Sequence, residues 1–167
     1  MAAELISSPA TRRRTSWTGR ASQHRRQQVG SRDARTDAQV EALWLSLVEV
    51  LRTMDDPSSA VLCTAEGTPV AAYGLPKPEV PRVSRQAGTA FATRTRPDGS
   101  VGEVGEVETV ELTAGWRHTV IASVPGADAD HLLSVTAEGV SPPLLEAWTR
   151  RAAEDLRQAL SVADAIE

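Results

Sequence analysis

The fold of this chain is decided by residues 60–75, which read AVLCTAEGTPVAAYGL. Two short apolar runs, residues 61–63 and 70–73, flank the polar segment 64–68, which contains Gly67. Short apolar runs on either side of a polar, glycine-containing turn are typical of a tight antiparallel hairpin. We therefore expect two paired β-strands here, and the rest of the chain is interpreted around them.

A helical segment precedes the hairpin. Thr36 and Gln39 have the spacing of a capping box, and Asp37 places a negative charge in the first turn, where the helix dipole favours it. The helix should stop at residues 55–56, because Pro57 disfavours helical geometry in the residue before it. Its apolar residues recur at intervals of three and four, and they are Val40, Leu43, Trp44, Leu47, Leu51 and Met54. One face of this helix should therefore lie in the core.

A second helix is expected over residues 81–96. Pro81 suits the first turn, where its missing amide costs nothing, and Pro97 closes the segment. Gly88 lies in its middle, and glycine costs about 1 kcal/mol relative to alanine inside a helix. Close approach of a second backbone would explain Gly88, so we expect this helix to meet its twin across a dimer axis. A surface helix with an incidental glycine is the alternative.

Three strands follow, over residues 106–112, 116–124 and 131–136. Short turns join them, so they should form an antiparallel meander. Three glutamates in the first of these strands, at positions 106, 108 and 111, indicate an exposed edge or an interface strand.

A last helix should begin with Ser141 as N-cap and Pro142 at the first helical position. Its predicted apolar face comprises Leu145, Trp148, Ala152, Leu156, Ala159 and Leu160. The element order is therefore helix-strand-strand-helix-strand-strand-strand-helix, which defines an α/β domain.

Charge is unevenly distributed along the 167 residues. Residues 1–35 carry eight arginines against Glu4 and Asp33, a net charge of +6, so that residues 36–167 carry −10. We predict a disordered, Arg-rich tail over residues 1–35 and one domain over residues 36–167. Two other interpretations stay open for the tail: it binds nucleic acid or anionic lipid through its guanidinium groups, or it is a targeting peptide.

The composition indicates a cytoplasmic protein. The one cysteine, Cys63, forms no internal disulfide, which suits a reducing compartment, and no apolar run of about 18 residues is present. The 17 arginines against one lysine, Lys77, point to a GC-rich bacterial genome.

Catalytic chemistry finds no support in the sequence, and no cofactor is expected. Nucleotide hydrolysis would need a glycine-rich loop ending in Lys-Ser or Lys-Thr, whereas Lys77 lies between two prolines. Cys63 with a distant histidine has no supporting third group, so a buried, inert thiol is expected.

Asp128, Asp130, His131 and His118 are candidate ligands for a metal ion. In a hairpin that pairs Val124 with His131, however, His118 lies six residues back, roughly 20 Å away. We therefore predict no metal site.

The hairpin VLCTAEGTPVAAYG, the later VETVELTAGWRHTVIASV and the closing amphipathic helix resemble the roadblock family of dynein light-chain relatives, particularly its bacterial members. The resemblance covers residues 37–160 and is carried by Glu66-Gly67 and Pro69-Val70-Ala71 in the hairpin. The chain differs from the family pattern in the arginines of its second helix and in His118.

The resemblance implies a single roadblock/profilin-like domain, with a five-stranded antiparallel sheet and helices on both sides. It also implies a homodimer formed through the second helix and the third strand. The residues expected near the dimer contact are Val83, Ala87, Gly88, Ala90, Phe91, Val107, Val110 and Leu112.

Family members commonly serve as non-enzymatic platforms or regulators for Ras-like small GTPases. The function implied by the resemblance is therefore a dimeric regulator or scaffold in a bacterial small-GTPase system, with no small-molecule substrate. The alternative, from the residues themselves, is an adaptor that binds nucleic acid or anionic surfaces through the basic tail.

Overall fold

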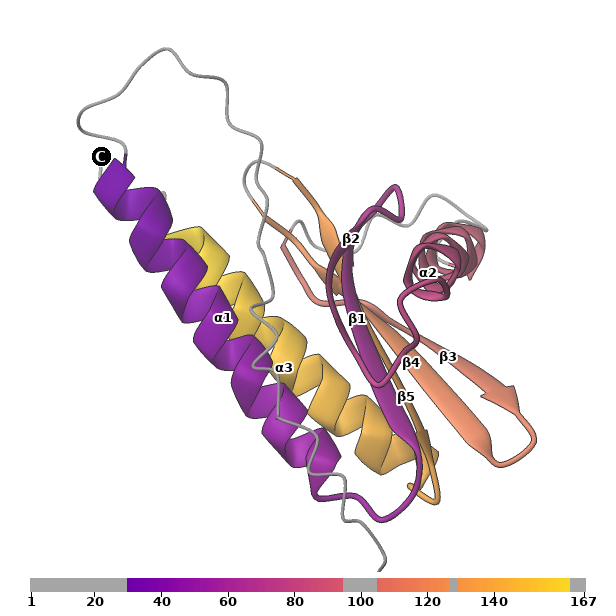
Figure 1. Ribbon diagram of the computed structural model, residues 1–167. Helices are drawn as coiled ribbons and strands as arrows, with labels where there is room; N and C mark the ends of the chain where they lie inside the picture. The colour runs from indigo at the N-terminus through magenta and orange to yellow at the C-terminus, as the bar shows by residue number, and fades with distance from the viewer. Residues whose placement is uncertain (1–29, 95–104, 127–128, 163–167) are drawn as a thin grey trace, which may run out of the picture.

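A computed structural model of the chain describes residues 30–94, 105–126 and 129–162 (Figure 1). The eight elements are, in order, α1 (Gly30–Arg52), β1 (Ser58–Thr64), β2 (Pro69–Tyr73), α2 (Val80–Arg94), β3 (Thr109–Ala114), β4 (Arg117–Val124), β5 (His131–Glu138) and α3 (Pro142–Val162). The predicted element order is thus confirmed.

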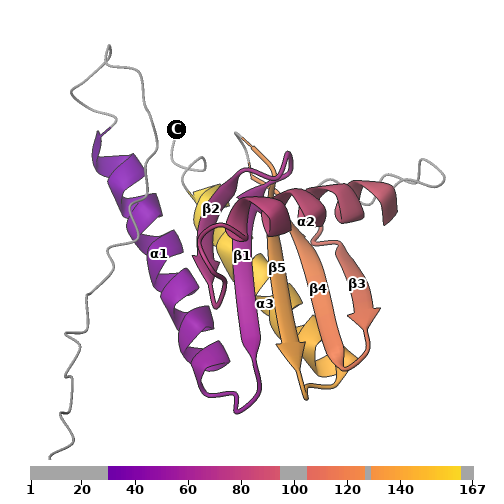
Figure 2. The same ribbon diagram turned by 45° about the vertical axis from the view of Figure 1, so that its right-hand side comes forward.

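The strands form one antiparallel sheet in the order β2-β1-β5-β4-β3. Helices α1 and α3 lie side by side on one face of this sheet, and α2 crosses the opposite face (Figures 1 and 2). The five-stranded antiparallel sheet with helices on both sides, expected from the resemblance, is therefore present.

The hairpin predicted over residues 60–75 is formed by β1 and β2, which pair Ala60 with Tyr73. Its turn is closed by the Gly67 amide, which donates to the Thr64 carbonyl at 2.8 Å. Gly67 has a φ of +85°, a conformation that residues with a β-carbon rarely adopt. The polar, glycine-containing segment makes the turn that its composition predicts.

Strands β3, β4 and β5 form the predicted meander, and Val124 pairs with His131 as expected. Strand β5 then pairs with β1 on its other side, so the hairpin and the meander make one sheet. This arrangement leaves β2 and β3 as the two edge strands of the sheet.

The main core lies between the sheet and the α1–α3 layer. Val40, Trp44 and Leu51 of α1 are buried there, as their spacing predicts. From the strands, alternate residues such as Val120 and Leu133 face this layer, because successive side chains of a strand point to opposite faces. A smaller core on the other face packs beneath α2 and includes Val61, Cys63, Ala87, Val110, Ile121 and Leu132.

Both predicted ends of the first helix are wrong. Helix α1 begins at Gly30, six residues before Thr36, so Thr36 is not its N-cap, and the domain boundary proposed at residue 36 falls inside a helix. Ser31 to Arg35 contain no proline or glycine, so nothing in that segment stops the helix. At the other end the helix finishes at Arg52, where the Thr53 amide donates to Val50 and tightens the last turn.

The predicted third strand is displaced along the chain. Strand β3 continues to Ala114, which pairs with Arg117, so Gly115 and Trp116 form a two-residue loop. Trp116 was expected on a strand face, but its side chain is 88% exposed in this loop. A two-residue connection matches the twist of an antiparallel pair, which favours pairing that continues to Ala114.

The predicted face of the last helix is correct except at one position. Helix α3 begins at Pro142 after Ser141, and Leu145, Leu156 and Ala159 are buried. Trp148 is 39% exposed, and the next residue, Thr149, is buried in its place. Thr149 tolerates burial because its hydroxyl donates to the Leu145 carbonyl at 2.7 Å within the helix.

Candidate interaction surface

The open edge of the sheet at β3 and the adjoining helix α2 form the candidate interaction surface. Among the described strands, β3 pairs with β4 alone, so its other side presents backbone donors and acceptors. Helix α2 crosses the sheet from the hairpin toward β3, and its C-terminal end lies at that edge (Figure 2). A strand edge beside a helix is a surface that a second chain can extend.

The structure brings together most of the residues predicted near a dimer contact. Six of the eight belong to one apolar cluster between α2 and the sheet, and they are Val83, Ala87, Ala90, Phe91, Val110 and Leu112. Ala87 and Val110 are buried, whereas the other four are half-buried. Val107 packs instead into the core on the α1–α3 face. The half-buried four remain partly available to another chain.

Gly88 has an explanation within its own chain. A β-carbon on Gly88 would stand 2.9 Å from the carbonyl oxygen of Ala65, in the hairpin turn. The turn also approaches α2 at Gly67, where a β-carbon would meet the Arg85 Cα at 2.8 Å. A second backbone does approach Gly88 closely, as its place in the sequence predicts, and within the single chain that backbone is the hairpin.

The outer surface of α2 is polar and shallow. Its exposed side chains include Arg82, Arg85, Gln86 and Thr89, and Arg82 lies 3.6 Å from the carboxylate of Glu79. The Nε of Arg85 donates to the Pro81 carbonyl one turn earlier. This surface therefore presents cationic side chains, where a twin helix packed face to face would favour small apolar ones.

A network around Arg150 holds the start of β3 against α3. The Arg150 guanidinium donates to the Val107 carbonyl at 3.2 Å, to the Thr109 hydroxyl at 3.0 Å and to Glu146 at 2.9 Å. Thr109 also donates to Glu146 at 2.9 Å, and the hydrogen bonds from Arg150 and then Thr109 lower the pKa of Glu146. These contacts, here called the Arg150 network, fix the edge strand that the candidate surface uses.

Sequence reasoning missed the Arg150 network. The sequence indicates only the Glu146–Arg150 pair, because these residues are four apart on a helix and therefore lie on the same side of it. Nothing in the spacing indicates that Thr109, 41 residues before Arg150, completes it.

Cys63 is buried as predicted. Its side chain is 0% exposed, and burial raises the pKa of its thiol to about 11. The thiol contacts the carbonyl oxygens of Ser84 and Leu132 at 3.9 and 3.8 Å. A thiol in this state is neither a nucleophile nor a metal ligand at neutral pH.

Within residues 30–94, 105–126 and 129–162, no group of three histidine, cysteine or acidic side chains is placed to hold a metal ion. Asp128, one of the candidate ligands, lies outside the described residues. His118 pairs with Ala137 and hydrogen-bonds to Thr113 at 3.1 Å, whereas His131 of β5 pairs with Val124 at the opposite end of β4. None of the described helices combines the length and the apolar character needed to cross a membrane.

An antiparallel sheet of order β2-β1-β5-β4-β3, with two helices on one face and one on the other, is the architecture of a roadblock domain. The chain has this fold. Solved structures support the assignment, whereas no family model and no curated protein matches the sequence.

Three of the similar structures illustrate the match. The Roadblock/LC7 domain from Streptomyces avermitilis has a TM-score of 0.56 at 18% identity, covering 71% of this chain and 95% of that one. An MglB with a tetrameric arrangement has a TM-score of 0.56 at 20% identity, covering 75% and 93%. The gliding protein MglB from Thermus thermophilus has a TM-score of 0.54 at 18% identity, covering 75% and 93%.

Proposed function

We propose that this chain forms a homodimer through β3 and α2, and acts as a non-enzymatic regulator or scaffold for a Ras-like small GTPase in the bacterial cytoplasm. The open edge of β3 on a roadblock fold is the observation that carries the proposal. The assembled MglB structure and the gliding protein, both of similar fold, are consistent with a protein that works by association.

The backbone groups that would pair across the dimer can be named. The Ser123 amide donates to the Glu108 carbonyl, which makes residues 108 and 123 a hydrogen-bonded pair. Because bonding alternates along an antiparallel ladder, the amide of Val110 faces β4 and that of Glu111 faces the open side. Glu111 is thus the position at which the edge can be blocked without removing a bond to β4.

Contacts from α2 would add apolar area beside this edge. Val83, Ala90 and Phe91 of α2 and Leu112 of β3 are half-buried in the single chain, so a second chain can cover what remains exposed. The arginines on the outer surface of α2 would stay in solvent, and they give the dimer a cationic face for an acidic partner.

Dimerisation is tested with a matched pair of variants at one position. Glu111→Pro removes an amide from the open edge, whereas Glu111→Ala removes the same carboxylate and keeps the amide. Size-exclusion chromatography with light scattering should report a dimer for the parent and for Glu111→Ala, and a monomer for Glu111→Pro. A dimer that survives Glu111→Pro with its circular dichroism unchanged would refute pairing at β3.

The GTPase role needs a separate measurement. Full-length protein, immobilised as bait, should retain a bacterial Ras-like small GTPase in one nucleotide state, or change its rate of GTP hydrolysis on addition. Glu111→Pro should weaken this effect if the dimer is the active form. A dimer that binds no bacterial Ras-like small GTPase in either nucleotide state counts against the regulator function and leaves the dimer proposal standing.

A further inference from the structure

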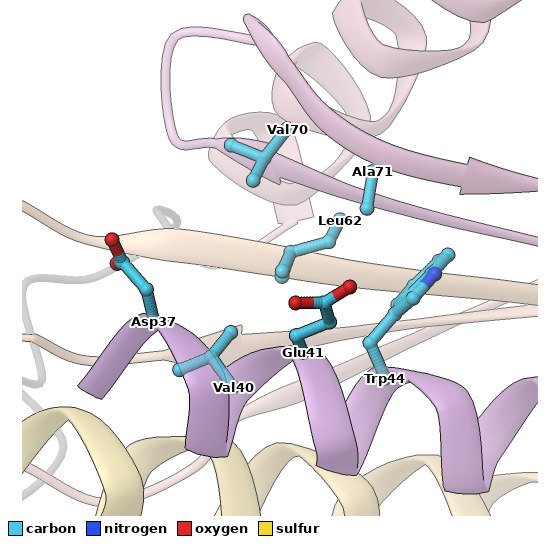
Figure 3. Close-up of a pocket in the computed structure, with 7 residues that line it drawn as sticks. All are labelled: Asp37, Val40, Glu41, Trp44, Leu62, Val70 and Ala71. Atoms are coloured by element: carbon cyan, nitrogen blue, oxygen red, sulfur yellow. The ribbon is translucent and has the colours of Figure 1, made fainter. Parts of the chain in front are cut away.

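A small apolar cleft opens between α1 and the hairpin, on the face of the sheet away from α2 (Figure 3). Val40 and Trp44 of α1 form one wall, and Leu62, Val70 and Ala71 of the hairpin form the other. Its volume is about 170 Å³. An apolar cavity of roughly 150 Å³ accommodates a benzene ring, so this cleft has room for the six-membered ring of one aromatic side chain.

Two carboxylates line the α1 side of the cleft. Asp37 and Glu41 are one turn apart on α1, and both side chains extend toward the strands of the hairpin (Figure 3). Both residues are exposed, whereas Val40 and Trp44 beside them are buried. An apolar slot with a negative rim selects a segment that combines an aromatic ring with cations.

The chain itself carries such a segment. Residues 12–17 read RRRTSW, so three consecutive arginines precede Trp17, with two residues between. Residues 1–29, which precede α1, carry +5 against −9 for residues 30–167, so the segment and the domain attract each other.

The geometry permits this contact. Twelve residues lie between Trp17 and Gly30, where α1 begins, and the connection spans up to about 45 Å when extended. Asp37 and Glu41 lie roughly 10 and 16 Å from Gly30 along the helix axis, at about 1.5 Å per residue. The linker is therefore long enough to turn back along α1 and reach the cleft.

We propose that residues 12–17 fold back along α1, with the Trp17 ring in the cleft and the arginines beside Asp37 and Glu41. Association with the domain then withholds the arginines from other anionic partners. This docking is independent of the proposed dimer and of any GTPase, since the cleft lies on the opposite face of the sheet from α2.

Paramagnetic labelling of the full chain tests the proposal. Cys63 is buried with its pKa raised to about 11, so a nitroxide can be attached selectively to Ser16→Cys, next to Trp17. The amide signals of Val40, Trp44 and Val70 should lose intensity, whereas those of β3 should not. Mixing labelled natural-abundance protein with unlabelled ¹⁵N protein identifies any contact between molecules.

Charge variants supply the matched control. Asp37→Lys/Glu41→Lys should abolish the loss of signal at the cleft, and Trp17→Ala should weaken it. Glu49→Lys/Asp55→Lys makes the same change in net charge at exposed positions outside the cleft, and it should leave the effect intact. The proposal is overturned if the broadening is uniform, lies on another surface, occurs only between molecules or survives the cleft substitutions.

Discussion

Gly88 of α2 lies against the carbonyl oxygen of Ala65, so closely that a β-carbon on the glycine would stand 2.9 Å from that oxygen. Both sides of this contact belong to backbone, one in a helix and the other in a hairpin turn, so neither moves aside easily. Gly88 therefore allows α2 to approach the hairpin turn this closely.

Gly88→Ala should therefore destabilise the fold, although alanine favours a helix by about 1 kcal/mol. Overpacking against a backbone oxygen costs about 1–3 kcal/mol, so we expect a net loss of about 1 kcal/mol or more. Urea denaturation followed by circular dichroism measures it. Thr89→Ala, at the exposed neighbouring position, is the control and should be neutral or slightly stabilising. Equal stability of Gly88→Ala and the parent would show that the hairpin turn moves to make room for the added methyl group.

Two tryptophans should respond differently to truncation. Trp44 is 6% exposed in the main core, and Trp116 is 88% exposed in the loop between β3 and β4. Trp44→Ala should cost about 3–5 kcal/mol, while Trp116→Ala should stay within about 0.5 kcal/mol. Thermal unfolding of both variants gives the comparison. A large loss for Trp116→Ala in the background of Glu111→Pro, the variant expected to be a monomer, would contradict the loop assignment.

The thiol of Cys63 should not react with reagents while the protein is folded. Because Cys63 is buried and its pKa is raised to about 11, a disulfide reagent at neutral pH should modify it only after unfolding. Thr89→Cys, which adds a thiol on the exposed side of α2, should react at once with one equivalent. Rapid modification of the parent would mean that α2 opens readily from the sheet.

The Arg150 network should make stability depend on pH in the acid range. Hydrogen bonds from Arg150 and Thr109 lower the pKa of Glu146 below its ordinary value of 4.5. Above pH 4.5 the ionised Glu146 therefore makes its full contribution to the free energy of unfolding. The contribution disappears as the pH falls through the lowered pKa of the folded state.

Glu146→Gln isolates this effect. The stability difference between parent and variant, at most about 1 kcal/mol for a half-exposed group, should be largest above the ordinary pKa of 4.5 and should shrink as the pH falls through the acid range below it. Urea midpoints across that range measure it. If the stability difference between the parent and Glu146→Gln grew as the pH fell, the pKa of Glu146 would not be lowered by folding.

Most of the fold was predictable because it depends on local pattern. The turn at Gly67, the proline at the start of α3 and the stripe from Val40 to Leu51 are each encoded by neighbouring residues. The predictions were wrong where a polar residue is buried because its hydrogen bond is made within its own helix. Thr149 takes an inward position expected for Trp148, because its hydroxyl is satisfied within the helix.

The candidate surface was only partly predictable. The residue types in α2 and β3 were enough to predict that these elements form the surface. The orientation of Gly88 toward the hairpin, and the packing of Val107 in the core on the α1–α3 face, depend on tertiary contacts. The Arg150 network joins residues up to 43 positions apart, a relationship that no short-range pattern contains.

The pairing of β1 with β5 also bears on synthesis. Cys63 lies beside Leu132, 69 residues later, so the middle of the sheet cannot form until strands that leave the ribosome long after the hairpin are available. Until then one side of β1 has no neighbour, and an exposed strand in a nascent polypeptide is prone to aggregation. Nascent chains stalled after α2 should be cleaved rapidly by protease, and those that extend beyond α3 should resist it.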